Sequence, residues 1–270
     1  GASVLNWLPW EDNIQGRMDR LIAEGVCQPM IVVMPDCFTR YGGSQYINSS
    51  ATGRYGDYLL EVVQFVDRSF RTLEDRDARA VAGKSSGGFG ALRAGMEHPE
   101  VFGLVADHSG DKFFEKCYAK DLLVLPDLLR RLDAPRILAN PGAVLLRDDD
   151  FHRFMDISAM SACYSPDPSA TLGFDWPVDT TTGEILPDVW ARWKSHDPVD
   201  LVERCADALR SLRLLYMDCG NRDEHSIHLG SRLMSRRPSR SSTARRFEGG
   251  RSVTMKQQSR RRPKSSTVTT

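Results

Sequence analysis

A serine lies between glycines in the segment VAGKSSGGFGAL, residues 81–92. Residues 83–87 match G-x-S-x-G, in which a tight turn between a strand and a helix exposes a serine hydroxyl as a nucleophile. The apolar run before the turn and the helical pattern after it provide this context. The glycines let the backbone pack closely, and the amide that follows the serine faces the oxyanion formed in acyl transfer. We therefore expect Ser85 to be the nucleophile and the backbone of Ser86 to bind the oxyanion.

A serine nucleophile needs a base, and the base needs an acid that orients it. The acid is expected in the segment LLYMDCGNRDEH, residues 214–225, where an apolar run leads into a polar turn. Asp223 is the first candidate, because a loop just beyond a strand can reach the active-site end of a sheet. Asp218, at the end of the expected strand, is the alternative.

The rest of the chain alternates short apolar runs with amphipathic helical patterns, which is typical of a parallel α/β protein. We expect strands at residues 30–36, 78–83, 102–110 and 212–220. Helices are expected at residues 58–70 and from the serine turn to the residue before Pro99. Residues 111–201 form a long helical and loop insertion, which should cover the end of the sheet where loops gather.

Charged residues are distributed unevenly, although the formal net charge of the 270 residues is zero. Residues 235–270 hold eleven of the 36 basic residues and one of the 36 acidic residues, with thirteen serines and threonines. The first 234 residues therefore carry 25 basic and 35 acidic side chains. This shift predicts a globular domain over residues 1–234 and a disordered basic tail over residues 235–270.

Several classes of protein are not expected from this sequence. No apolar run is long enough to cross a membrane, and the first residues lack the order of a signal peptide. The six cysteines are widely spaced without a C-x-x-C pair, which favours reduced cytoplasmic thiols over disulfides or a metal site. The glycine turn lacks both the dinucleotide fingerprint and the Walker spacing. We therefore expect a cytoplasmic protein that uses no metal and no cofactor.

Four segments together resemble the putative-esterase family of α/β-hydrolases: PMIVVMPDCFTRYGGSQYINSSATGRYGDYL, AVAGKSSGGFGALRAGMEHPEVFG, ADHSGDKFFE and LLYMDCGNRDEHSIHLGSRLM. That family includes the esterase D and S-formylglutathione hydrolase group, enterochelin esterases, feruloyl esterases and mycolyltransferases. The resemblance covers most of residues 1–234. It implies an α/β-hydrolase fold and a Ser-His-Asp hydrolase that acts on esters or thioesters without a cofactor. By this resemblance, Ser85 is the nucleophile and Asp223 is the acid that orients the base.

Two features depart from this family. Its members have the base histidine in a GGH turn after the last strands, where this chain reads FEGGR and places Arg251. Arginine stays protonated and cannot accept the serine proton. No histidine follows His228, and His108, at a strand end, is the substitute base that we expect nearest to Ser85. The family's early strands and its second oxyanion loop would precede Gly1, so the sheet is expected to lack its N-terminal strands.

We therefore expect a serine hydrolase of the carboxylesterase or thioesterase type, with a small-molecule ester or thioester as its partner. Two alternatives are an inactive hydrolase-like protein, truncated or shifted in frame near residue 235, and an acyltransferase of the same fold. Gln45 and Tyr46, in a loop after the first strand, are candidates for substrate binding. A nucleic-acid partner is not expected, because the basic tail lacks interleaved aromatic residues for base stacking.

Overall fold

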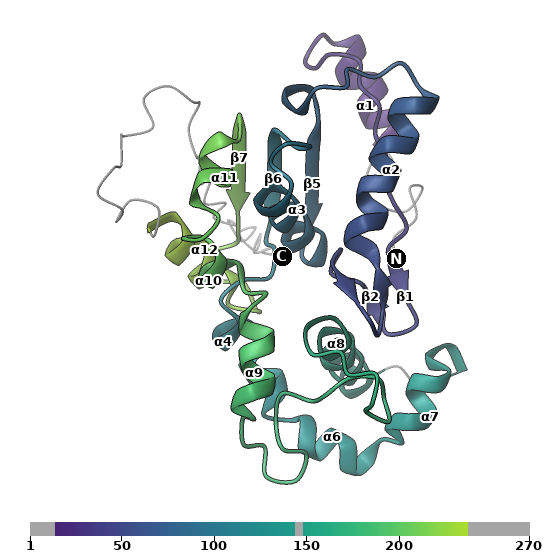
Figure 1. Cartoon of the computed structure of the whole chain (residues 1–270), viewed down its shortest axis with the longest axis vertical. Coiled ribbons are helices and arrows are strands. Elements are labelled where there is room, and N and C mark those ends of the chain that lie inside the picture. The colour runs from purple at the N-terminus through teal and green to yellow at the C-terminus, as the bar shows by residue number, and fades with distance from the viewer. Residues whose placement is uncertain (1–13, 144–147, 237–270) are drawn as a thin grey trace, which may run out of the picture. The chain divides into compact units, whose positions relative to one another are not determined.

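The computed structural model describes residues 14–143 and 148–236 (Figure 1). The chain forms two compact units, and both are discontinuous in sequence. Unit 1 comprises Gly1–Glu74 and Asp127–Trp176, and unit 2 comprises Asp75–Pro126 and Pro177–Thr270. The expected tail lies outside the described residues from residue 237 onward, and so does Arg251.

Unit 2 is built on a parallel sheet of strands β5 (Ala80–Lys84), β6 (Leu104–His108) and β7 (Leu214–Asp218), in the order β5-β6-β7. The structure thus confirms the expected strands at residues 78–83, 102–110 and 212–220. The register pairs Lys84 with His108 and His108 with Asp218, so these last residues of three strands lie in one row. Because side chains alternate between the two faces of a sheet, all three belong to the same face.

Helix α3 (Ser86–Glu97) covers the opposite face of the sheet, where Figure 1 shows it alongside β5 and β6. Its Gly95 packs so tightly that a Cβ there would lie 2.5 Å from Cγ2 of Val105. Phe89 and Leu92 are fully buried on this helix. The apolar core of unit 2 is formed by Leu92, Met96, Val199, Leu201, Val202, Leu209, Met217 and Met234.

The expected strand at residues 30–36 is wrong. These residues adopt no strand, and the side chains of Met30, Ile31, Val32 and Val33 are 44–55% exposed. An apolar run becomes a strand only when a neighbouring strand takes up its backbone hydrogen bonds. Among the described residues, no strand pairs with this segment.

Unit 2 contains further described helices, and some of them contribute residues to this core. They are the 3-10 helix Arg76–Ala78, α4 (Phe114–Cys117), α5 (Ala119–Leu122), α9 (Pro187–Lys194), α10 (Pro198–Leu201), α11 (Ala206–Ser211) and α12 (Ile227–Arg236). The segment expected as an insertion, residues 111–201, is divided between the two units, and its part in unit 2 contains the short helices α4, α5, α9 and α10.

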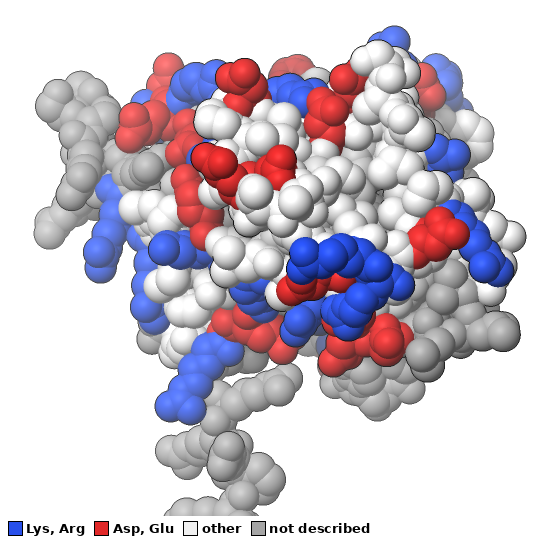
Figure 2. Space-filling model, turned by 90° about the horizontal axis from the view of Figure 1, so that it is seen from below, with Lys and Arg blue, Asp and Glu red and all other residues white. Residues whose placement is uncertain are grey.

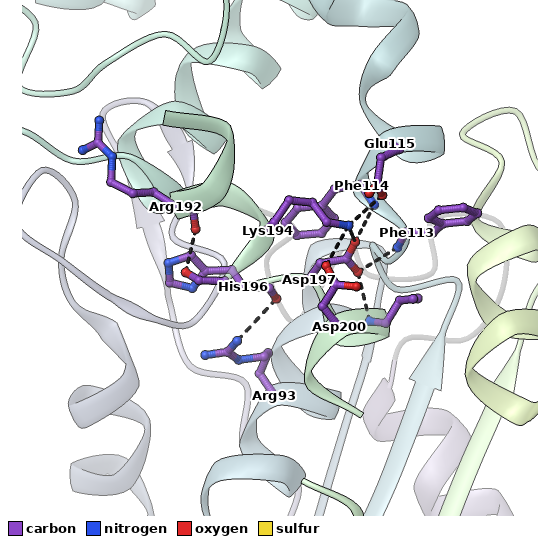
Figure 3. Close-up of polar contacts among 11 residues, drawn as sticks. Arg93, Phe113, Phe114, Glu115, Arg192, Lys194, His196, Asp197 and Asp200 are labelled. Atoms are coloured by element: carbon purple, nitrogen blue, oxygen red, sulfur yellow. Dashed lines mark hydrogen bonds and ion pairs between the residues drawn. The ribbon is translucent and has the colours of Figure 1, made fainter. Parts of the chain in front are cut away.

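A buried carboxylate joins two of these helices. The side chain of Asp197 is fully buried and accepts hydrogen bonds from the amides of Phe113 and Phe114 at the start of α4, at 2.9 and 2.8 Å (Figure 3). It also accepts from the amide of Val199 at 2.9 Å and so caps α10. A charged acceptor at two helix N-termini satisfies amides that have no partner inside their own helices.

The ammonium group of Lys194 completes this cluster. It lies 2.7 Å from Glu115, 2.8 Å from Asp197 and 2.9 Å from Asp200, as Figure 3 shows. Burial works to lower the pKa of Lys194, but the hydrogen bonds to the carboxylates of Asp197, Glu115 and Asp200 outweigh it and raise the pKa. Lys194 therefore remains charged at neutral pH and compensates the buried Asp197.

Unit 1 is mainly helical. Its described elements are α1 (Ile14–Ala23), α2 (Tyr55–Ser69), α7 (Ala134–Ala139), the 3-10 helix Pro141–Ala143, α8 (Asp149–Tyr164) and the short hairpins β1–β2 (Phe38–Thr39, Gly42–Gly43) and β3–β4 (Asn48–Ser49, Gly53–Arg54). Helix α6 (Leu125–Arg131) crosses the boundary between the units. Helix α2 confirms the helix expected at residues 58–70.

Charges of both signs lie next to one another on the surface. Figure 2 shows basic and acidic side chains interspersed on one face. Exposed pairs one helical turn apart include Arg54–Asp57, Arg130–Asp127 and Arg210–Asp207. Pairs of this kind contribute only about 0–1 kcal/mol to stability, so the fold rests on the buried contacts described above.

None of the described helices is both long and apolar enough to cross a membrane. All six cysteines are free thiols. Burial raises the pKa of Cys163 to about 12, and that of Cys117 well above its ordinary value. These two cysteines therefore pack as small apolar side chains and stay protonated at neutral pH.

Candidate active site

Ser85 occupies the turn between β5 and α3. Its backbone angles are φ 55° and ψ −125°, a conformation that a residue with a side chain rarely adopts. The side chain is exposed and makes no capping hydrogen bond to the described amides of α3. A strained turn that frees a serine hydroxyl is the conformation required of a nucleophile elbow.

The glycine before the serine makes this turn possible. A Cβ on Gly83 would lie 2.2 Å from the carbonyl oxygen of Gly87, far inside contact distance. The backbone of the turn is fixed further by two hydrogen bonds of 3.0 Å, from the amide of Ser85 to the carbonyl of His108 and from the amide of Phe89 to the carbonyl of Ser85. The first glycine of the G-x-S-x-G motif thus has a direct steric reason.

Ser86 is the first residue of α3. The first amides of a helix have no acceptor within the helix, and the helix dipole places partial positive charge at this end. The amide of Ser86 is therefore chemically suited to stabilise an oxyanion beside Ser85.

His108 and Asp218 meet at the carboxyl edge of the sheet. Nδ1 of His108 lies 2.9 Å from Oδ1 of Asp218, and these side chains are 45% and 29% exposed. The hydroxyl of Tyr216 donates to Oδ2 of Asp218 at 3.2 Å, and its ring lies against that of His108 with centroids 5.4 Å apart. Sequence reasoning named both residues separately but missed their pairing, which depends on the register of β6 and β7.

Asp223, the first candidate for the acid, lies in the turn between β7 and α12. Its Oδ1 accepts hydrogen bonds from the amides of His225 and Ile227, at 3.0 and 3.1 Å. In this structure, therefore, the carboxylate that binds His108 is that of Asp218, whereas that of Asp223 binds the turn that leads into α12.

A buried ion pair, which the sequence did not predict, lies at the carboxyl end of the sheet. Asp107 and Lys112 are fully buried, with Nζ of Lys112 2.7 Å from Oδ2 of Asp107. Oδ1 of Asp107 accepts from the amide of Gly110 at 2.7 Å, and a Cβ on Gly88 would lie 2.7 Å from the same oxygen. The pair therefore packs directly against the first turn of α3, which follows Ser85.

Gln45 and Tyr46 belong to unit 1, where both have positive φ, 52° and 57°. The amide nitrogen of Gln45, which is fully buried, lies 2.8 Å from the hydroxyl of Tyr164 and 3.0 Å from Sδ of Met160. Burial raises the pKa of Tyr46. The substrate contact expected of both residues stays a prediction.

Cys219 follows Asp218 directly and offers another nucleophilic atom near the sheet edge. Burial is the main cause that raises the pKa of its thiol. Because the thiolate is the reactive form of cysteine, a raised pKa keeps Cys219 mostly in its less reactive thiol form at neutral pH. The described residues include no group of three or more His, Cys, Asp or Glu side chains that could hold a metal ion.

A family model described as putative esterase matches residues 10–252. An esterase of Mycobacterium tuberculosis is 34% identical over 85 residues, which cover 31% of this chain and 19% of that protein. An endo-1,4-beta-xylanase/feruloyl esterase of Xylanibacter ruminicola is 33% identical over 114 residues, covering 38% of this chain and 16% of that protein. The chain thus spans less than a fifth of the length of the relatives that it matches.

Among solved structures, a ferulic acid esterase is 20% identical with a TM-score of 0.48, covering 85% of this chain and 70% of that one. An S-formylglutathione hydrolase of Staphylococcus aureus is 18% identical with a TM-score of 0.37, covering 72% of this chain and 56% of that one.

Proposed function

This chain belongs to the putative-esterase family, and we propose that it is a serine hydrolase that cleaves carboxylic esters or thioesters through an acyl-enzyme on Ser85. The observation that carries the proposal is the backbone of Ser85, φ 55° and ψ −125°, in a turn between strand and helix. A residue kept in a strained conformation needs surroundings that impose it, and the close approach of Gly83 and Gly87 does so.

In this proposal, Ser85 attacks the carbonyl carbon and the amide of Ser86 stabilises the oxyanion, as its place at the start of α3 supports. The family resemblance assigns the orienting acid to Asp223. We further propose that Gln45 and Tyr46 contribute to substrate recognition, since adjacent positive φ values are a form of strain that concentrates at functional sites. No step of this mechanism needs a metal or a cofactor.

A second candidate function follows from the sequence, because Arg251 occupies the position of the family's base histidine. Without a base, only the residual rate from positioning and from the oxyanion site would remain, and the chain would be a hydrolase-like protein without efficient turnover. An acyltransferase would keep the same acyl-enzyme but pass the acyl group to an alcohol instead of water.

The test is hydrolysis of short-chain p-nitrophenyl esters by the chain and by its Ser85→Ala variant, with circular dichroism to establish that both are folded. We expect turnover that disappears in the variant and a fluorophosphonate adduct on Ser85. Equal background rates from two folded proteins would favour the second candidate. An added alcohol that accepts the acyl group in place of water would identify an acyltransferase.

A further inference from the structure

The carboxyl edge of the β5-β6-β7 sheet holds an imidazole and a carboxylate in contact. Asp218 only accepts hydrogen bonds when ionised, so the 2.9 Å contact with Nδ1 of His108 requires the proton on Nδ1. The second carboxylate oxygen accepts from Tyr216 at 3.2 Å. Asp218 is thus held on both oxygens and fixes the tautomer of His108, which leaves Nε2 as the nitrogen that can accept a proton.

This imidazole belongs to the strand next to Ser85. The amide of Ser85 donates to the carbonyl of His108 at 3.0 Å, so the two residues are joined directly through their backbones. The side chain of His108 is 45% exposed and lies at the same edge of the sheet as the serine turn. A half-exposed ring can exchange its proton with a substrate or with water.

We propose that His108 is the general base for Ser85 and that Asp218 is the residue that positions it. This inference rests on the proposed function. It assigns the general base, because Arg251 occupies the position of the family's base histidine in this chain. It also replaces Asp223 as the orienting acid, because Oδ1 of Asp223 accepts from the amide of His225 in the turn and from that of Ile227 at the start of α12.

The proposed reaction has two stages, acylation of Ser85 and hydrolysis of the acyl-enzyme. Oγ of Ser85 bonds to the carbonyl carbon, its proton passes to Nε2 of His108, and the π pair of the carbonyl moves onto the oxyanion. Collapse of the oxyanion expels the alkoxide or thiolate, which takes the proton from Nε2 and leaves the acyl-enzyme. Water then attacks with loss of a proton to Nε2, and the proton returns to Oγ of Ser85 as the carboxylic acid departs.

Asp218 and Tyr216 together hold the ring of His108. Oδ1 of Asp218 contacts Nδ1 of the ring, while the ring of Tyr216 lies against the imidazole and its hydroxyl donates to Oδ2 of the same carboxylate. Removing the carboxylate is therefore expected to free the imidazole to adopt the other tautomer, which cannot accept the serine proton on Nε2.

The experiment compares Ser85-dependent hydrolysis of p-nitrophenyl esters in His108→Gln, Asp218→Asn and a control, His225→Gln. The control is matched, because His225 is 49% exposed and also lies near a carboxylate, that of Glu224. We expect His108→Gln to lose about 10²–10⁴-fold in kcat, the usual contribution of a general base. Asp218→Asn should lower kcat while KM stays close to the wild-type value, because the imidazole is no longer held in the tautomer that accepts the proton, whereas the control should keep the wild-type rate.

The outcomes separate this inference from the proposed function. Turnover that requires Ser85 but survives His108→Gln would overturn the assignment of the base and leave the serine hydrolase intact. Failure of the wild-type chain to exceed Ser85→Ala, with no phosphonate adduct on Ser85, would refute both. Should His108→Gln fail to fold by circular dichroism, Asp218→Asn decides, since an unchanged kcat in that variant would also overturn the proposal.

Discussion

Gly83 and Gly87 are packed so closely that a single Cβ on Gly83 would meet the carbonyl oxygen of Gly87 at 2.2 Å. The obstacle is backbone rather than the end of a flexible side chain, so it cannot move aside easily. We expect Gly83→Ala to destabilise the protein by about 3 kcal/mol, the upper end of the usual cost of overpacking. Gly220→Ala is the control, because nothing lies within 4 Å of its Cβ position. Equal urea midpoints for the two variants would contradict this account of the turn.

The oxyanion role of Ser86 can be tested through its amide. Ser86 is the first residue of α3, a position where proline is compatible with a helix because the missing amide has no helical partner. Proline also disfavours the strained backbone of the residue before it, so Ser86→Pro should keep the helix but lower kcat by at least about 10²–10³-fold, through loss of the oxyanion donor and through a shift of Ser85. Ser86→Ala keeps the amide and should retain the wild-type kcat. If both folded variants hydrolyse p-nitrophenyl esters equally well, the amide of Ser86 is not the donor.

Asp107 and Lys112 form a buried ion pair, in which each charge offsets the cost of burying the other. Lys112→Met leaves an uncompensated buried carboxylate and is expected to cost about 3–5 kcal/mol. The double variant with Asp107→Asn should recover part of this loss in urea unfolding. Arg210→Met, which breaks an exposed pair with Asp207, should cost no more than about 1 kcal/mol. Similar losses from Lys112→Met and Arg210→Met would show that burial does not control the energy of the pair.

His196 makes stability depend on pH. Burial, with a smaller effect of Arg93, lowers its pKa from 6.5 to about 4. Between these values the unfolded chain binds a proton that the folded chain does not, so stability should fall as pH decreases from about 6.5 towards about 4. From pH 7.5 to pH 5 the loss from this residue should be on the order of 2 kcal/mol.

The measurement for His196 is urea unfolding at both pH values, compared with His196→Gln. The hydrogen bond from Arg93 goes to the backbone carbonyl of residue 196, so the substitution does not remove that acceptor. The difference between wild type and variant should be larger at pH 7.5 than at pH 5. A difference independent of pH would mean that His196 has the same pKa in the folded and unfolded chains.

The sequence predicted those elements that are determined by local residue patterns. The turn around Ser85, helix α3 and the strands β5, β6 and β7 follow from apolar runs and glycine spacing, and the structure contains them. The expected strand at residues 30–36 is wrong because an apolar run does not specify its pairing partner. The contact of His108 with Asp218 and the pair of Asp107 with Lys112 depend on strand register and loop packing, which no local pattern encodes. Residues 1–13, 144–147 and 237–270, with Arg251, lie outside the described structure.

The position of β7 along the chain has a consequence for synthesis. Ser85 and His108 lie within one β-α-β segment, but Asp218 follows His108 by 110 residues. A ribosome adds these residues over several seconds or more, so the nascent chain holds the serine turn and the imidazole long before the carboxylate exists. Closing so long a loop also makes this contact slow to form, compared with the local packing of α3 on β5. The His108–Asp218 pair should therefore be among the last parts of unit 2 to assemble, after the turn that it is proposed to serve.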